Sequence, residues 1–294
     1  MIKSLTSVVA LVGLISGASY AQESPCRDID IRDNRAYVSI DIGEKQYPAM
    51  LTTSNVGMSV SRGLAKELDL EVLRDSRVGV VGHFGEAQTG YYVQKLKFTL
   101  FGKELEGDNL FVSNGYRSEL SVSLRLFSDS IVQLDIPKSK VCFYPRKAID
   151  LWEIKNIRMD SDSKFGTPVV QTKLQNKHIW LKISPEYTGG VIIDSVVADS
   201  LGLYEQDGLK ENRDGLSWSG ILPEFTFGPY ELANVSVSFP KKGVEENLTT
   251  RNRTATGTHI RSSTASRGEI GMDVLRHFLL TMDLEKEIMH IYAE

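Results

Sequence analysis

The chain is dominated by short stretches in which apolar and polar residues alternate. Residues 35–53 (RAYVSIDIGEKQYPAMLTT) alternate on both sides of a Gly-Glu-Lys turn. Residues 91–113 and 130–144 show the same pattern, each with a turn near its middle. Alternation with a period of two places every second side chain on one face of a strand, so each stretch predicts a β-hairpin. Several such strands at regular spacing predict an all-β sandwich or barrel with a few small helices.

Helical spacing occurs at equivalent places in the two halves of the chain. Residues 60–70 (VSRGLAKELDL) match residues 193–203 (IDSVVADSLGL) at a constant offset of 133. Ser61 and Asp194 both fall at the N-cap position of the predicted helices. Two further pairs of segments keep the same order in both halves, namely 98–105 with 225–232 and 131–144 with 279–292. We therefore predict a duplicated lobe.

The first residues have the character of a secretory signal peptide. Lys3 supplies a positive start, residues 8–15 form a short apolar run, and small residues follow up to Ala21. The run is well short of the ~20 apolar residues that a membrane-spanning helix needs. We predict a signal peptide over residues 1–21, a periplasmic or secreted location, and no integral membrane segment in the mature chain.

The remaining residues are enough for two lobes of ordinary size. A polar stretch within residues 147–164 is typical of a linker, so the lobes are expected over residues 22–150 and 151–294. The hydrophobic content of 41% supports a packed core, and the net charge of -4 comes with scattered Lys and Arg. This charge distribution argues against a nucleic-acid partner.

The cysteines and histidines narrow the chemistry further. Cys26 and Cys142 both follow the predicted signal peptide, and in an oxidising compartment they are expected to form a disulfide. The five histidines show no spacing typical of a metal site. The glycines of residues 79–85 match no phosphate-binding loop. We therefore expect no metal and no cofactor, and nothing in the pattern defines the oligomeric state.

The order of features in each half resembles the retropepsin-like aspartic proteases of bacteria, in the pepsin-like superfamily. Residues 268–292 (GEIGMDVLRHFLLTMDLEKEIMHIY) resemble the closing segment of that family. Residues 64–70 (LAKELDL) and 197–203 (VADSLGL) resemble its helix. The resemblance covers most of residues 30–292 and implies a mainly β fold. It implies two acid-protease β-barrel lobes, each with a short helix, around a pseudo-twofold axis.

The resemblance also implies a site. In that family each lobe supplies one Asp from an Asp-Thr-Gly-Ala elbow, and the two carboxyls share a proton. One acts as base on a water while the other protonates the substrate carbonyl, and a flap covers an extended peptide bound by strand-like hydrogen bonds. The elbows correspond to Thr52, Thr53, Ser54 and Asn55 and to Ser184, Pro185, Glu186 and Tyr187, and the flap to Gly82, His83, Phe84 and Gly85.

Both elbows depart from the pattern of the family. Thr52 stands where the first Asp is expected, and a threonine hydroxyl does not ionise near neutral pH. Pro185 stands at the second position, or Ser184 or Glu186 if the count shifts by one residue. No residue is therefore expected to be catalytic. The other acids of the repeat are interpreted as structural: Asp194 as a helix N-cap, and Asp135, Asp273 and Asp283 in the closing segments.

These departures predict an exported, catalytically inactive homologue that binds an extended peptide or protein segment between the lobes. Two alternatives stay open. One is an active endopeptidase with a displaced acid such as Glu186 or Asp194, and the other is a purely structural envelope protein. His83 is expected at the surface of the flap, and residues 241–269 are expected to form a polar loop near the cleft side of the second lobe.

Overall fold

The computed structural model describes residues 25–53, 57–73, 78–85, 87–108, 110–113, 119–162, 166–248 and 264–293. The predicted signal peptide and the elbow residues Ser54 and Asn55 lie outside these ranges. The described chain is mainly β, with few and short helices, as the alternating pattern predicted. None of its helices has the length and apolar character needed to cross a bilayer.

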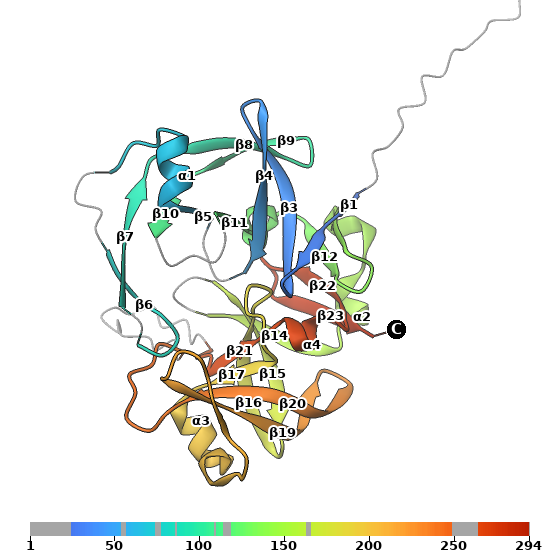
Figure 1. The fold of residues 1–294 in the computed structure, drawn as a ribbon. Coiled ribbons are helices and arrows are strands. Elements are labelled where there is room, and N and C mark those ends of the chain that lie inside the picture. The colour runs from blue at the N-terminus through green and yellow to red at the C-terminus, as the bar shows by residue number, and fades with distance from the viewer. Residues whose placement is uncertain are drawn as a thin grey trace, which may run out of the picture.

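One sheet is formed by the first lobe alone. In the described residues its order is β6-β7-β10-β5-β11-β4-β3-β8-β9, with β2 paired to β3, and it occupies the upper part of Figure 1. The predicted hairpin of residues 35–53 is present as β3 and β4. The strands are β2 (Asp30–Arg32), β3 (Arg35–Ile42), β4 (Lys45–Thr52), β5 (Met58–Ser61), β6 (Val78–Val81), β7 (Ala87–Val93), β8 (Leu96–Leu100), β9 (Lys103–Gly107), β10 (Leu110–Ser113) and β11 (Leu120–Ser123).

A larger sheet joins the two lobes. Its order over the described residues is β1-β13-β12-β22-β23-β14-β15-β16-β21-β17-β20-β19-β18. The strands are β1 (Cys26–Asp28), β12 (Ile131–Asp135), β13 (Lys140–Tyr144), β14 (Ile157–Ser161), β15 (Pro168–Leu174), β16 (Lys177–Ile183), β17 (Val191–Ile193), β18 (Lys210–Glu211), β19 (Ser217–Phe227), β20 (Tyr230–Pro240), β21 (Gly268–Ile270), β22 (Leu279–Asp283) and β23 (Ile288–Tyr292). Because β1, β12 and β13 precede residue 150, this sheet runs across the predicted lobe boundary.

The helices are short, and two of them, Arg62–Glu67 and Ser195–Ser200, lie at equivalent places in the two lobes. Ser61 caps α1 by accepting a hydrogen bond from the amide of Leu64 at 3.1 Å, and Asp194 caps α3 by accepting one from Val197 at 2.8 Å. Both predicted N-caps are confirmed. Helices of six residues are not stable in isolation, so packing of their apolar faces must hold them in place. The helical segments are α1 (Arg62–Glu67), α2 (Leu151–Ile154), α3 (Ser195–Ser200), α4 (Met272–Leu275) and the 3-10 turns η1 (Leu124–Phe127), η2 (Arg146–Ala148) and η3 (Leu203–Glu205).

The pairing of β12 with β22 places a pseudo-twofold axis between the lobes. The internal repeat aligns residues 131–144 with 279–292, so Gln133 corresponds to Thr281. These two residues lie directly opposite each other across the antiparallel pair, and the side-chain amide of Gln133 donates to the Thr281 hydroxyl at 3.1 Å. A pair of corresponding residues can face each other only at a twofold axis. The axis therefore passes between β12 and β22, which lie between the lobes in Figure 1.

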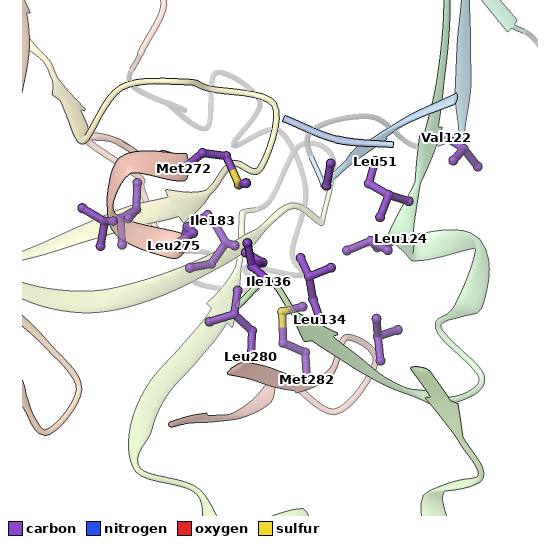
Figure 2. Packing of buried hydrophobic residues seen from close by; sticks show 14 of the residues in the cluster. Leu51, Val122, Leu124, Leu134, Ile136, Ile183, Met272, Leu275, Leu280 and Met282 are labelled. Atoms are coloured by element: carbon purple, nitrogen blue, oxygen red, sulfur yellow. The ribbon is translucent and has the colours of Figure 1, made fainter. Parts of the chain in front are cut away.

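The hydrophobic core is continuous through both lobes. Figure 2 shows buried side chains of the two lobes packed in one cluster. The labelled ones are Leu51, Val122, Leu124, Leu134 and Ile136 from the first lobe and Ile183, Met272, Leu275, Leu280 and Met282 from the second. Truncating one of these side chains to alanine would cost about 2–5 kcal/mol, because lost burial and the remaining cavity both destabilise the fold. The lobes are thus packed as one body.

The N-terminal end of the described chain is fastened to the first lobe. Cys26 lies opposite Cys142 in the antiparallel pair of β1 and β13, and the two form a disulfide. The predicted disulfide is confirmed. It closes a sequence separation of 116 residues and holds β1 at the edge of the larger sheet.

Candidate functional site

The first elbow begins where β4 leaves the interior of the first lobe. The last four residues of β4 are all buried, and the final one, Thr52, lies beside Ser123 of β11. Thr52 and Thr53 are both buried. The Thr53 hydroxyl donates to the backbone carbonyl of Ile183 in the second lobe. Because a buried polar group needs a hydrogen-bond partner, this contact fixes the first elbow against the second lobe.

The second elbow approaches from the opposite side. β16 ends at Ile183, and the amide of Ser184 then donates to the carbonyl of Ile270 at 3.0 Å. The chain turns, and the amide of Tyr187 donates back to the carbonyl of Ser184 at 3.1 Å. This turn brings Oε1 of Glu186 within 2.8 Å of the Thr52 hydroxyl, which donates to it. The structure therefore brings Thr52, Thr53 and residues 184–187 together, as the repeat predicted for the two elbows.

The strand register changes which residue of the second elbow corresponds to Thr52. β11 runs parallel to β4 and antiparallel to β5, and β21 has the same relation to β16 and β17. In these pairs Val122 lies beside Leu51, and Ile270 lies beside Ile183. Ser184 directly follows Ile183 just as Thr52 directly follows Leu51, so Ser184 is the residue that corresponds to Thr52. Pro185, which counting back from the helix indicated, is one residue off because the second elbow is one residue longer.

A turn of the first lobe holds the second elbow in place. The turn between β2 and β3 has left-handed backbone at Asp33 and Asn34, with φ of 49° and 54°. The Asn34 side-chain amide donates to the carbonyl of Thr188 at 2.6 Å and to Oδ1 of Asp273 at 2.9 Å. Nε of Arg35 donates to the carbonyl of Glu186 at 3.3 Å. The position of Glu186 is therefore set by both lobes.

In the described part of the chain, the side-chain contact between the two elbows joins one carboxyl group to one hydroxyl. Proton-sharing hydrolysis needs a pair of carboxyls, one ionised and one protonated, close to the same water. Here the hydrogen bond across the axis joins Glu186 to Thr52. By strand register, Ser184 stands where the resemblance places the second catalytic Asp. A threonine hydroxyl is not an acid or base near neutral pH. This arrangement can orient a polar ligand group but offers no shared proton.

The flap connects β6 and β7 and lies against the second lobe. Nε2 of His83 is 3.3 Å from Oε1 of Glu269, and Nζ of Lys182 is 3.6 Å from the same oxygen. Burial by itself would raise the pKa of Glu269. The charges of His83 and Lys182, with the hydrogen bond from His83, outweigh burial and hold that pKa well below its usual range. Glu269 is therefore an ionised carboxylate beneath the flap.

Apolar and backbone contacts complete the seating of the flap. Phe84 is buried in a small cluster with Ile192 and Leu248 of the second lobe. The His83 ring lies edge-on to the Tyr187 ring, with centroids 6.3 Å apart. The His83 carbonyl accepts a hydrogen bond from the amide of Asn247 at 3.1 Å. The flap tip therefore contacts both the second elbow and the chain that follows β20.

Sequence reasoning missed part of this cluster. It placed His83 on the surface of the flap, and the side chain is indeed 40% exposed, but its carboxylate partner was not identified. Glu269 stands in β21, a strand that is otherwise buried and apolar, and an acid in such a strand is the signal that could have revealed it. The loop predicted over residues 241–269 also proved too broad, because residues 268–270 form a strand and residues 244–248 are packed on the flap.

The other acids of the repeat have structural contacts. Asp194 caps α3 and forms an ion pair with Arg267, whose Nε is 2.6 Å from Oδ2. Asp283 is paired with Arg146 at 2.7 Å, and Oδ1 of Asp135 accepts a hydrogen bond from the amide of Lys138 at 3.1 Å. Asp273 is held by Asn34. These contacts agree with the structural interpretation of all four residues.

Surface hollows and metal-ligand clusters do not add to the site. A hollow of about 240 Å³ lies beside α2 and β23, and another of about 530 Å³ lies beside β8 and β9. Neither includes an elbow or flap residue. Within the described ranges, no group of three or more His, Cys, Asp and Glu side chains has the arrangement of a metal site.

Comparisons with known proteins give a distant structural likeness. No protein-family model matches the chain, and no curated protein matches it. Among solved structures, the crystal structure of basic 7S globulin from soybean aligns over 91% of this chain and 94% of that chain. The identity is 9% and the TM-score is 0.46. A likeness of this level assigns neither a family nor a function.

Proposed function

We propose that the chain is an exported, catalytically inactive protein of the aspartic-protease type, which binds an extended peptide beside its flap. The observation that carries this proposal is the hydrogen bond from Thr52 to Glu186, at the place where the two elbows meet. The resemblance of the sequence to retropepsin-like proteases supplies the family, and the pseudo-twofold axis at Gln133 and Thr281 is consistent with it.

Among the described residues, the contact between the elbows joins a carboxyl group to a hydroxyl and not to a second carboxyl, which argues against catalysis. General acid–base chemistry on a peptide bond needs a base for the water and an acid for the carbonyl or leaving group. Glu186 offers one carboxyl group, which accepts a hydrogen bond across the axis from the Thr52 hydroxyl. Glu269 is a buried acid beneath the flap, and His83 and Lys182 keep it ionised, so it is a poor proton donor.

Main-chain contacts of the flap support peptide binding. The His83 carbonyl already accepts a hydrogen bond from the main chain of another segment, at Asn247. In the described part of its sheet β6 pairs with β7 alone, so β6 is an edge strand. Edge strands pair readily with an added extended chain through backbone hydrogen bonds. An extended peptide is therefore the ligand class that matches the flap.

The proposed export has two supports. Disulfides persist in oxidising compartments, and Cys26 and Cys142 form one. The charged and apolar pattern of residues 1–21 is that of a signal peptide, although these residues lie outside the described ranges. Peptide mass mapping of the secreted or periplasmic protein would check cleavage after Ala21.

The absence of peptidase activity can be tested directly. The purified protein is incubated with a degenerate peptide library from pH 3 to pH 8, and products are followed by mass spectrometry. We expect no cleavage products that depend on the elbows. A product that disappears in the Glu186→Gln variant, or with an aspartic-protease inhibitor, would establish the active-endopeptidase alternative instead. Library peptides retained by the protein after gel filtration would support the binding proposal.

A purely structural role is the second candidate, and the buried Phe84 favours it. Phe84, Ile192 and Leu248 hold the flap against the second lobe, beside Tyr187 of the second elbow. Hydrogen–deuterium exchange separates the two roles, because a flap that opens to admit peptides exchanges its amides faster than the core strands. Flap amides as protected as those of β12 and β22 would favour the structural role.

A further inference from the structure

The flap contacts a segment of the chain that returns from β20. The amide of Lys241 donates to the carbonyl of Leu216 at 2.9 Å, and the amide of Val244 donates to the carbonyl of Lys241 at 3.1 Å. After this turn, residues 244–248 (Val-Glu-Glu-Asn-Leu) run along the flap tip, where the amide of Asn247 donates to the His83 carbonyl. We call residues 244–248 the resident segment.

The last side chain of the resident segment fills an apolar socket. Leu248 is 0% exposed, and it packs with Phe84 (5%) and Ile192 (1%). Tyr187, Leu216 and Val244 are packed at the border of this cluster. Full burial of a leucine side chain removes its apolar surface from water and so stabilises this contact. We call the surroundings of Leu248, namely Phe84, Ile192, Tyr187 and Leu216, the Leu248 socket.

The middle of the resident segment is anchored to the second lobe. Oε2 of Glu246 accepts a hydrogen bond from the amide of Ser195 at 2.9 Å, and Oε1 accepts one from the Ser195 hydroxyl at 2.7 Å. Gly85 of the flap lies close to the carbonyl of Glu245, since a Cβ at Gly85 would be 3.0 Å from that oxygen. The resident segment is therefore held on one side by the flap and on the other by Ser195.

We propose that the resident segment is an internal ligand of the flap, and that the peptide which binds there places a large aliphatic side chain in the Leu248 socket. This inference rests on the proposed function and names its ligand class. The residue before the aliphatic one uses its amide to reach the His83 carbonyl, as Asn247 does. The external peptide must displace Leu248, so the resident segment restrains binding.

This competition has a measurable consequence. When a site is open for only a fraction of the time, the apparent dissociation constant is the intrinsic one divided by that fraction. A tethered competitor acts at a high effective concentration, on the order of millimolar for a short connection. Removing the Leu248 side chain should therefore strengthen the binding of an external peptide rather than weaken it.

The probe is a fluorescein-labelled, C-amidated peptide of the sequence Val-Glu-Glu-Asn-Leu, and fluorescence anisotropy measures its binding to the mature chain with its disulfide intact. We expect Leu248→Ala to bind the probe at least tenfold more tightly than the unaltered protein. Leu100→Ala, which truncates a buried leucine of β8 in the first-lobe sheet, is the matched control and should bind as the unaltered protein does. A probe with alanine in place of leucine should bind at least tenfold more weakly.

A second variant covers the case in which Leu248→Ala does not fold. Glu246→Gln weakens the anchor at Ser195 without opening a cavity, and it should strengthen probe binding about threefold. Glu231→Gln, an exposed change on β20, is its control and should have no effect. Equal probe binding by the unaltered protein, Leu248→Ala and Glu246→Gln would overturn the internal-ligand proposal.

The remaining outcomes separate this inference from the proposed function. If no variant binds the probe but the protein retains other peptides from a library, the internal-ligand proposal is wrong and the binding function stands. If no variant retains any peptide, both are wrong. Equal binding of the leucine and alanine probes would contradict the assignment of the socket.

Discussion

The two lobes carry different chemistry at the same position beside their elbows. In the first lobe Ser121 of β11 lies between Met50 of β4 and Ser59 of β5, and the two serine hydroxyls are hydrogen-bonded. In the second lobe Glu269 of β21 lies between Lys182 and Ile192 in the same register. One backbone arrangement therefore encloses a neutral hydroxyl pair in the first lobe and an ion pair in the second.

The difference between the lobes indicates a role for the ion pair of Lys182 and Glu269. A buried ion pair is weak support for stability, because desolvation of both charges opposes their attraction. The hydroxyl pair of the first lobe shows that this strand arrangement forms without buried charges. Yet the lobe that holds Glu269 is the one on which the flap rests, and His83 of the flap is the third member of the cluster. The comparison suggests that the second lobe keeps its carboxylate to hold the flap.

Lys182→Met gives the second lobe the residue found in the first and should have the largest effect. It leaves Glu269 buried without its lysine, and breaking such a pair costs about 3–5 kcal/mol. The double change Lys182→Met with Glu269→Leu removes both charges and replaces them with apolar side chains of similar volume, so it should be nearly neutral. Urea unfolding at pH 7 measures both free energies. A single variant as stable as the double one would break the comparison.

β1 and β14, which occupy equivalent places on either side of the β12–β22 pair in the larger sheet, offer a second contrast. β1 is linked to β13 by the Cys26–Cys142 disulfide, whereas β14 is held on β23 with the help of Asn156, whose side chain bonds both the amide and the carbonyl of Ile291. Replacing both cysteines with serine should cost about 2–4 kcal/mol, since the closed loop is long. Asn156→Ala should cost about 1–2 kcal/mol. Urea midpoints that rank the two changes in the opposite order would show that the covalent link is the weaker one.

The two helix caps repeat the contrast on a smaller scale. Ser61 is a neutral cap, and Asp194 is a charged one paired with Arg267. Asp194→Ser keeps a cap of the first-lobe type and loses the ion pair, which should cost about 2 kcal/mol. Ser61→Ala loses only the cap and should cost about 1 kcal/mol. Thermal unfolding of the two variants checks this order, and equal losses would mean that Arg267 contributes nothing.

Much of the fold could be predicted from the sequence because its signals are local or repeated. Alternation identified the hairpins, and the repeat brought Thr52 near residues 184–187. The caps Ser61 and Asp194 and the disulfide were also identified correctly. These features depend on neighbouring residues or on a constant offset, and both are visible in one sequence.

The site was less predictable because its contacts join distant strands. Counting back from the helix selected Pro185 instead of Ser184. The second elbow contains one extra residue, and the offset of 133 between the two helices does not reveal it. Glu269, Lys182 and His83 come from three separate segments, and no spacing in the chain relates them. The packing of Leu248 against Phe84 likewise depends on how the lobes dock.

The pH dependence of stability is the finest test of the difference between the lobes. The pKa of Glu269 is lowered in the folded protein, so below the ordinary glutamate pKa of about 4.3 the unfolded chain binds a proton that the folded chain does not. The stability contributed by Glu269 is therefore fully present above that pH and is lost as the pH falls, by at most about 1.4 kcal/mol per pH unit.

Glu269→Gln isolates this contribution. Between pH 5 and pH 3 the unaltered protein should lose stability faster than Glu269→Gln, as measured by urea unfolding at each pH. Other carboxylates, such as Asp283 beside Arg146, are present in both proteins and cancel in the difference. Ser121→Ala is the first-lobe control, and its pH profile should run parallel to that of the unaltered protein because the hydroxyl pair does not titrate. Parallel profiles for Glu269→Gln and the unaltered protein would mean that the buried carboxylate of the second lobe is not stabilised by His83 and Lys182. The two lobes would then differ in composition but not in electrostatics.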